Sequence, residues 1–189
     1  RRPMSILGAI IAGGQGRRFA APDGRGDKGA ALVCGTALID HVAAVLGQQT
    51  DDLVIVGRDW PSLPSIPDRP HADEGPLGGL CAALHHARER GHDQVLCAGC
   101  DTLPVPPRLA DMLAPGPAVM DGHWLMSLWP SALADDLDRW LNDQPDRSIR
   151  GWMAHTHARA VPHGMLLLNI NTQEALAEAE ALFGRDQSS

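Results

Sequence analysis

One stretch near the start of the chain, ILGAIIAGGQGRRFAAPDGRGDKG at positions 6–29, constrains the fold most. Its first part, Ile6 to Ala12, contains no polar residue, which predicts a strand covered on both faces, as in a parallel sheet. Because the glycines that follow lack Cβ atoms, the backbone there can turn several N–H groups toward one anion. We therefore expect a strand that leads into a polyanion-binding loop, with a nucleoside triphosphate as ligand. The loop glycines are Gly13, Gly14 and Gly16, and the compensating charges are Arg17, Arg18, Arg25 and Lys28.

The basic residues of the chain are distributed unusually. There are 15 arginines and a single lysine, Lys28, which lies at the end of this loop. An ammonium group is a compact point charge that fits a crowded phosphate site where a planar guanidinium does not. We predict that Lys28 contacts the triphosphate and takes part in catalysis together with Arg18. The alternative is that the presence of a single lysine in the chain is a chance of composition.

Length and charge narrow the possible functions. A chain of 189 residues is long enough for one well-packed α/β domain and short for two, so we expect a single domain over 1–189. The formal net charge of −7 argues against nucleic acid as a partner, because binding a phosphate backbone requires excess Lys and Arg. No apolar run approaches the roughly 18 residues of a membrane span. We expect a cytoplasmic protein with no membrane partner.

After the loop, the hydrophobic pattern predicts alternating helices and strands, and therefore an α/β fold. Strands are expected at 53–56, 94–99 and 165–170, with two edge segments near 118 and over 125–129. Helices are expected at 38–46 with Gly47 as C-cap, from the Gly75-Pro76 opening onward, near 107–113, and at 131–141, 147–155 and 173–183. Asn171-Thr172 is expected to cap the last helix.

The four cysteines include one C-x-x-C pair, Cys97 and Cys100, which is a spacing known from zinc and redox sites. This pair ends an apolar strand, and an offset of three in a strand points the two side chains to opposite faces. We therefore do not expect the pair to be functional. The nine histidines show no convincing ligand spacing, so we expect them to be solvated, including the adjacent His85 and His86 on a helix.

Two aspartates and two asparagines are further candidates. Asp101 directly follows a buried strand, where a carboxylate suits a Mg²⁺ ion that also binds substrate phosphates. Its alternative role is to cap a turn. Asp68 lies between prolines seven residues before Gly75, which is also typical of a turn residue. Asn169 and Asn171 are expected on one strand face, where two amides could hydrogen-bond a heterocycle or simply cap a helix.

The loop matches neither common phosphate motif. Phe19 breaks the dinucleotide fingerprint, and Gly29 stands where the Walker motif has Ser or Thr. The segments IAGGQGRRF and DKG instead resemble the (L/I)AGGxxxRMGxDK signature of nucleotidyltransferases, in the branch of the molybdenum cofactor guanylyltransferases, the MobA family. The resemblance extends over about residues 6–183. It implies a three-layer α/β/α, Rossmann-like fold whose sheet is mostly parallel with an antiparallel strand.

The resemblance also implies an activity: Mg²⁺-dependent transfer of GMP from GTP to the terminal phosphate of molybdopterin. The N-terminal half would bind nucleotide and the C-terminal half molybdopterin, with cofactor biosynthesis proteins and acceptor molybdoenzymes as further partners. The GPLGG segment at 75–79 and the Gly99-Cys100-Asp101 segment match family motifs, as does Asn169-Ile170-Asn171-Thr172 on the pterin side. The implied nucleotide-binding residues are Ile11, Ala12, Gly13, Gly14, Lys28, Asp68 and Asp101, the implied metal ligand is Asp101, and the implied substrate-binding residues are Asn169 and Asn171.

Several departures from the family pattern leave alternatives open. The loop between Arg18 and Lys28 is longer than in typical members, and Gly57 stands where guanylyltransferases can carry an asparagine that contacts the nucleotide. Asp73 or Glu74 could take the place of Asp68. The alternatives to guanylyl transfer are cytidylyl transfer to molybdopterin, nucleotidyl transfer to a sugar phosphate, and a nucleotide-sensing subunit without turnover. The Ala12-Gly13-Gly14 sequence favours the guanylyl branch.

Overall fold

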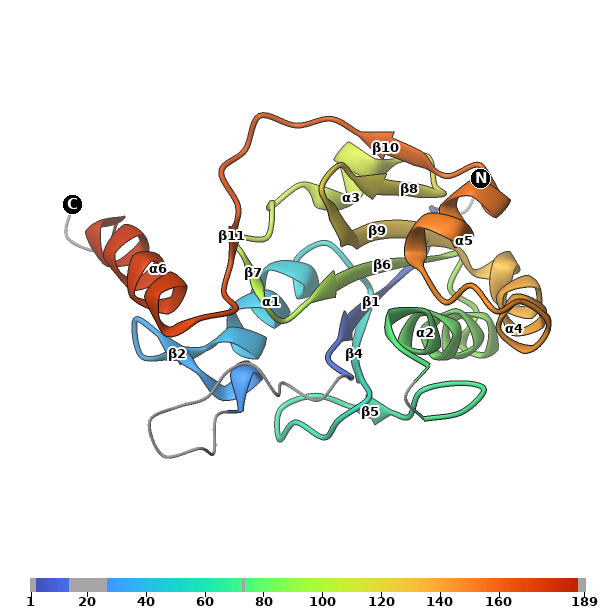
Figure 1. Cartoon of the computed structure of the whole chain (residues 1–189), viewed down its shortest axis with the longest axis horizontal. Coiled ribbons are helices and arrows are strands. Elements are labelled where there is room, and N and C mark those ends of the chain that lie inside the picture. The colour runs from blue at the N-terminus through green and yellow to red at the C-terminus, as the bar shows by residue number, and fades with distance from the viewer. Residues whose placement is uncertain (1–2, 14–26, 73, 187–189) are drawn as a thin grey trace.

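The structure, a computed structural model, describes residues 3–13, 27–72 and 74–186, and its centre is a seven-stranded sheet (Figure 1). From one edge to the other the strands are β10 (Arg159–Val161), β8 (Ala118–Met120), β9 (His123–Pro130), β6 (Gln94–Gly99), β1 (Ile6–Ile11), β4 (Asp52–Val56) and β5 (Ser65–Ile66). Strand β9 is antiparallel to both of its neighbours, and the other pairs are parallel. The predicted mostly parallel sheet with an antiparallel strand is confirmed.

Helices cover both faces of this sheet and make three layers (Figure 1). One face packs against α2 (Pro76–Arg90), α4 (Ala134–Asp143) and α5 (Ile149–Thr156), and the other against α1 (Leu38–Gly47) and α3 (Leu109–Leu113). The position of β1 in the sheet explains its wholly apolar sequence. Leu7 and Ala9 belong to the hydrophobic core on one face, whereas Ile10 belongs to the core on the other. A strand covered on both faces needs apolar side chains at every position.

Strands form at the two segments predicted near 118 and over 125–129, but the prediction that they are edge segments is wrong. Strands β8 and β9 lie inside the sheet, and the edge is formed by β10, where no strand was predicted. Strand β10 has three residues, all at least partly exposed, so its sequence carries no hydrophobic signal. The sequence of β9 does not reveal its interior position, because only its pairing with distant β6 and β8 places it there.

The C-terminal segment also differs from expectation. Within the predicted strand 165–170, only β11 (Leu168–Asn169) forms, and it pairs with β7 (Thr102–Leu103) in a separate two-stranded sheet. The apolar run is misleading because Leu166 is 72% exposed. Helix α6 (Gln173–Asp186) follows, and the Thr172 hydroxyl accepts a hydrogen bond from its Ala175 N–H, so Thr172 rather than Asn171 caps it.

Two 3₁₀ turns and a short hairpin complete the fold. The 3₁₀ turn η1 (Lys28–Ala30) leads into the hairpin β2 (Leu32–Val33) and β3 (Thr36–Ala37), against which α6 packs. A second turn, η2 (Ser131–Leu133), begins the predicted helix at 131–141. Gly47 is the last residue of α1 and not its C-cap, which is Gln48. No helix in the described ranges has the length and apolar character needed to span a membrane.

Candidate active site

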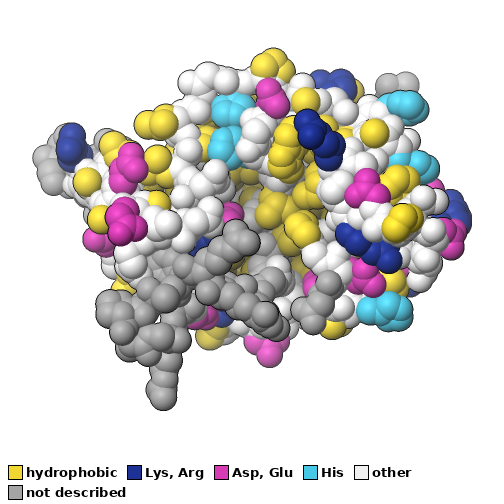
Figure 2. Space-filling view, viewed as in Figure 1, with side chains coloured by type: hydrophobic (Ala, Val, Ile, Leu, Met, Phe, Trp, Pro, Cys, Tyr) yellow, Lys and Arg dark blue, Asp and Glu magenta, His cyan; other side chains and the backbone are white. Residues whose placement is uncertain are grey.

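The carboxyl ends of β1, β4 and β6 lie at one edge of the sheet, and two hollows open there. The first, which we call the β6 hollow, has a volume of about 240 Å³. It is lined by Pro76, Gly99, Asp101, Thr102, Gly122, His123, Trp124, Leu125, Met126, Ile149 and Asn169. The second, the β4 hollow, has a volume of about 370 Å³. It is lined by Gly13, Gly57, Arg58, Asp59, Ser65, Ile66, Pro67, Asp68 and Ala72. Figure 2 shows hydrophobic side chains gathered in a hollow near the middle of the molecular face.

Lys28 contacts two other predicted site residues. Its Nζ atom donates a hydrogen bond to Asp101 Oδ2 at 2.8 Å and another to Asn171 Oδ1. The Lys28 side chain is 17% exposed and that of Asp101 33%, so the ion pair is only partly screened by water. Three segments far apart in the sequence therefore meet at one ammonium group, which agrees with a special role for the only lysine.

Asp27 and Arg58 stabilise the start of the 3₁₀ turn η1, whose first residue is Lys28. Asp27 caps η1, accepting a hydrogen bond from the Gly29 N–H at 3.1 Å. Arg58 donates to the same carboxylate at 2.6 Å and also lies over the ring of Trp60. The hydrogen bond from Arg58 holds the pKa of Asp27 below its usual value. Sequence reasoning missed Arg58, although a basic residue directly after the carboxyl end of a buried strand was a usable signal.

Asp101 lies at the end of β6, as predicted, and the C-terminal segment packs against it. The Ile170 N–H donates to the Asp101 carbonyl at 2.6 Å, and Thr102 Oγ1 donates to Asn169 Oδ1 at 2.8 Å. Asn169 thus lines the β6 hollow, whereas Asn171 contacts Lys28. The expectation that both amides share a strand face does not hold, because β11 ends at Asn169.

The carboxylate of Asp101 suits a hard divalent cation. Its Oδ2 atom and Asn171 Oδ1 both accept hydrogen bonds from the cationic Lys28 Nζ, so two oxygen atoms from distant segments face one positive charge. Mg²⁺ binds such oxygen ligands, commonly through one or two carboxylates together with waters and substrate phosphates. The residues present therefore fit a Mg²⁺ ion.

Gly13, Gly57 and Asp68 meet tightly beside the β4 hollow. A Cβ atom on Gly13 would lie 3.1 Å from Asp68 Oδ2 and 3.3 Å from the Gly57 Cα. The preceding residues are fixed, since Ile11 is 5% exposed and the Ala12 N–H donates to the Val56 carbonyl at 3.0 Å. Asp68 thus lies next to Gly13, the first of the loop glycines.

Gly57 supports this arrangement, and substituting it should have two effects. Its φ is +85°, and a Cβ atom there would lie 2.5 Å from the Gly13 Cα. We expect Gly57→Ala to destabilise the protein by about 2 to 6 kcal/mol, because left-handed strain and overpacking each cost about 1 to 3 kcal/mol. We also expect weaker nucleotide binding, since Gly13 must move. Denaturant unfolding and nucleotide titration measure the two effects.

Gly91 provides a matched control for this prediction. It also has a left-handed φ, +81°, but a Cβ atom there meets nothing within 4 Å. Gly91→Ala should therefore cost only the strain of about 1 to 3 kcal/mol, without the overpacking, and leave nucleotide affinity unchanged. Equal losses of stability and affinity in the two variants would contradict the proposed contact between Gly57 and Gly13.

Other predicted residues are less informative or have different partners. Gly14, Gly16, Arg17, Arg18, Phe19, Arg25 and Asp73 lie outside the described residues. Glu74, an alternative to Asp68, forms an ion pair with Arg147 at 3.3 Å. The glycines at the start of α2 permit close packing, as expected, because a Cβ atom on Gly79 would lie 2.9 Å from Ile11 Cγ2.

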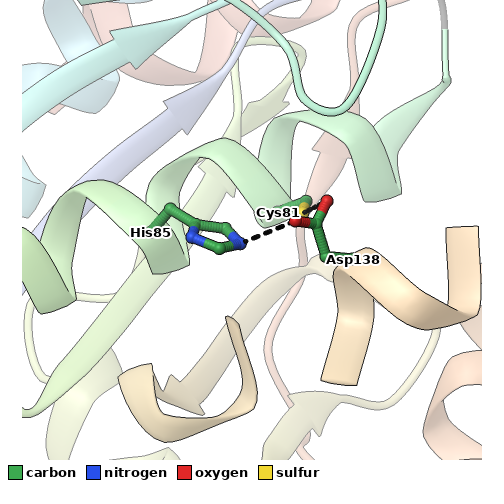
Figure 3. Close-up of side chains that lie close together, drawn as sticks. All are labelled: Cys81, His85 and Asp138. Atoms are coloured by element: carbon green, nitrogen blue, oxygen red, sulfur yellow. Dashed lines mark hydrogen bonds and ion pairs between the residues drawn. The ribbon is translucent and has the colours of Figure 1, made fainter. Parts of the chain in front are cut away.

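The cysteine and histidine expectations have mixed outcomes. Cys97 belongs to one core and Cys100 packs against the other, which confirms that they face opposite sides of the sheet. The expectation that the histidines are solvated is wrong for His85 and His92, which are 6% and 7% exposed. His85 lies beside Cys81 and Asp138 (Figure 3). The four-residue spacing of Cys81 and His85 on a helix was the missed signal.

Comparisons with known proteins show the family of this chain. The family model described as "MobA-like NTP transferase domain" matches residues 8–160, which is more than half of the chain. The chain belongs to the MobA-like NTP transferase family. A molybdenum cofactor guanylyltransferase from Cereibacter sphaeroides is 36% identical over 198 residues, covering 97% of this chain and 100% of that protein. The protein of the same name from Acidiphilium cryptum is 33% identical, covering 93% and 94%.

Two solved structures share the fold. The molybdopterin-guanine dinucleotide biosynthesis protein A from Archaeoglobus fulgidus aligns with a TM-score of 0.71 at 22% identity, covering 95% of this chain and 99% of that one. A nucleotidyl transferase from Methanothermobacter thermautotroptrophicus aligns with a TM-score of 0.71 at 19% identity, covering 96% and 99%. At these identities the structural likeness supports the three-layer fold, and the sequence relatives carry the family assignment.

Proposed function

We propose that this MobA-like nucleotidyltransferase transfers GMP from GTP to the terminal phosphate of molybdopterin. An oxygen of the acceptor phosphate attacks the α-phosphorus of GTP and forms a new P–O–P linkage. The bond from the α-phosphorus to the bridging oxygen breaks, and pyrophosphate leaves with its electron pair. The curated relatives named molybdenum cofactor guanylyltransferase support this reaction over almost the full chain.

The observation that carries the proposal is the position of the Lys28–Asp101 pair. Asp101 lines the β6 hollow, while Gly13 and Asp68 line the β4 hollow at the same sheet edge. We assign the β4 hollow to the nucleotide and the β6 hollow, with Asn169, to molybdopterin. The chain halves then divide the substrates between them, as the family resemblance implies.

The chain's own residues need to position anions more than to move protons. A phosphate monoester with a second pKa near 6 is largely ionised at neutral pH, so no strong general base is required. The barrier comes from repulsion between two anions and from charge that develops on the leaving group. Lys28 offsets that charge. A Mg²⁺ ion bound at Asp101 would supply further charge neutralisation and substrate orientation.

The base choice is the most direct test. Pyrophosphate release should be measured with GTP, ATP, CTP and UTP, each with and without molybdopterin, and the product should be identified by mass. We expect release with GTP that depends on molybdopterin. Equal or faster release with CTP would contradict guanylyl transfer. Tight GTP binding with no release under any condition would indicate a nucleotide-sensing protein.

A further inference from the structure

A cluster of three different metal-ligand side chains lies away from the site described above. Cys81 and His85 are four residues apart on α2, and both face Asp138 of α4 (Figure 3). The two helices pack against each other on one face of the sheet. Neither the nucleotide hollow nor the acceptor hollow includes any of the three residues. The proposed reaction therefore does not account for the cluster.

The separations in the cluster are close to those of a metal site. His85 Nε2 lies 3.3 Å from Asp138 Oδ2, and Cys81 Sγ lies 3.6 Å from Asp138 Oδ1. The ligand atoms of all three residues lie within 4.8 Å of one another. In a tetrahedral zinc site, bonds of about 2.0 to 2.3 Å place the ligand atoms about 3.3 to 3.8 Å apart. Small side-chain rotations would bring the three atoms to this geometry.

His85 has a buried polar atom that its surroundings do not satisfy. The residue is 6% exposed, and its Nε2 atom makes no hydrogen bond among the described residues, although it lies 3.3 Å from Asp138 Oδ2. Burial lowers the pKa of His85, which favours the neutral imidazole. A neutral imidazole is the form that binds metal. The unsatisfied atom is aimed at the point where Cys81 and Asp138 also converge.

We propose that Cys81, His85 and Asp138 bind a divalent cation of borderline softness, Zn²⁺ in the first place, with a fourth position open to water. The set of one thiolate, one imidazole and one carboxylate suits Zn²⁺ or Co²⁺, whereas Mg²⁺ prefers oxygen ligands only. The site differs in chemistry from the oxygen ligands at Asp101. It would fasten α2 to α4.

Two arginine side chains contact residues of the cluster and must move away when the cation binds. Arg69 Nη2 lies 3.2 Å from Asp138 Oδ2, and Arg88 Nη2 lies 3.3 Å from His85 Nδ1. The Arg69 and Arg88 side chains are 45% and 43% exposed, so each can turn into water when a metal replaces its charge. Arg88 also keeps a 2.6 Å ion pair with Asp135.

A route from solvent reaches the cluster. A hollow of about 320 Å³ opens beside His85. It is lined by Ile66, Pro67, Asp68, Arg69, Pro70, Ala82, His85, His86 and Glu89. Its lining also includes Asp68, so the entry lies between the cluster and the proposed nucleotide site. A hydrated cation can therefore approach His85 without unfolding of the helices.

Binding should release a proton from Cys81. Burial, together with the charge of Asp138, raises the pKa of this thiol to about 12, and Asp135 acts in the same direction while Arg69 opposes it. The thiol is thus protonated at neutral pH, and the metal must displace its proton.

The test is a Co²⁺ titration of the full chain after treatment with a chelator. We expect one equivalent of Co²⁺ to produce a near-ultraviolet thiolate-to-cobalt absorption band that Zn²⁺ abolishes by competition. Cys81→Ser should remove the band. His85→Gln and Asp138→Asn should each weaken Zn²⁺ binding by about 100-fold or more. Loss of a residue that only orients a metal ligand costs about 10- to 100-fold, and loss of a ligand itself should cost at least as much. Circular dichroism of each variant establishes that it is folded.

Matched controls separate this site from the rest of the chain. Cys100→Ser changes the cysteine next to Asp101, and His86→Gln changes the neighbouring histidine on α2; both should keep the band and the affinity. Metal bound only at Asp101 gives no thiolate band. The absence of a band in the parent protein, or its persistence in folded Cys81→Ser, would overturn the proposal.

Discussion

Asp101→Asn is expected to lower turnover by about 10³-fold or more while leaving the fold intact. The amide cannot provide the anionic oxygen that a Mg²⁺ ion requires, and a metal of this kind contributes several kcal/mol to stabilising the transition state. Asp101 is partly exposed, with 33% of its side chain accessible, so the change leaves no buried cavity. Measurements of kcat with GTP and molybdopterin over a range of Mg²⁺ concentrations, together with thermal unfolding, test this expectation.

The substitution also separates charge from position. An asparagine side chain still offers one oxygen to Lys28, so the 2.8 Å hydrogen bond from its Nζ can persist without the ion pair. A large loss of turnover then points to the missing negative charge and not to a displaced lysine. Asp111→Asn serves as the control, because this aspartate of α3 lies outside both hollows and its side chain is 68% exposed. Near-normal activity of Asp101→Asn at saturating Mg²⁺ would contradict the assignment of Asp101 as a metal ligand.

The sequence predicts best the elements whose signal is local. Strand β6 has the predicted bounds, Gln94–Gly99, because a short apolar run followed by a turn defines both of its ends. Helix α2 begins at Pro76, as the Gly-Pro opening indicates. Strand β10 was missed because its three residues are stabilised by pairing with β8, not by their own hydrophobic pattern. Pairing of this kind is not visible in a local window.

The candidate site shows the same division between local and distant information. Individual residues such as Asp101 and Gly13 could be chosen because each follows the carboxyl end of a buried strand. The contact between Lys28 and Asn171 spans 143 residues and depends on the pairing of β11 with β7. The role of Arg58 depends on Asp27, 31 residues away in the chain. Residue types thus indicate the chemistry, while the folded sheet decides which side chains meet.

At Lys28, the contribution of the positive charge and the contribution of the side-chain shape can be tested separately. Its Nζ atom hydrogen-bonds both Asp101 and Asn171, so it lies where the end of β6 meets the C-terminal segment. Charge moves toward pyrophosphate as the bond to the α-phosphorus breaks, so the ammonium should matter more in the transition state than in the bound substrate. Lys28→Ala should therefore lower kcat more than it weakens GTP binding.

The expected loss in Lys28→Ala is about 3 to 4 kcal/mol, or roughly 10² to 10³ in rate, as for other preorganised contacts to a developing charge. Removing Nζ also leaves the Asp101 carboxylate without its cation. To separate these effects, GTP affinity should be measured by titration and kcat by pyrophosphate release. A variant that loses affinity and turnover in equal proportion would place Lys28 in ground-state binding alone.

Lys28→Arg is the more discriminating substitution because it preserves the positive charge. A guanidinium fork binds a carboxylate through two parallel hydrogen bonds, so it would engage both oxygens of Asp101 and compete with a metal there. It is also planar and bulkier than the 17% exposed ammonium that now lies between Asp101 and Asn171. We expect a loss of kcat close to that of Lys28→Ala, with folding and net charge unchanged. If Lys28→Arg instead matches the parent in kcat and GTP affinity, the single lysine is a chance of composition, and the site depends on Asp101 and the glycine loop.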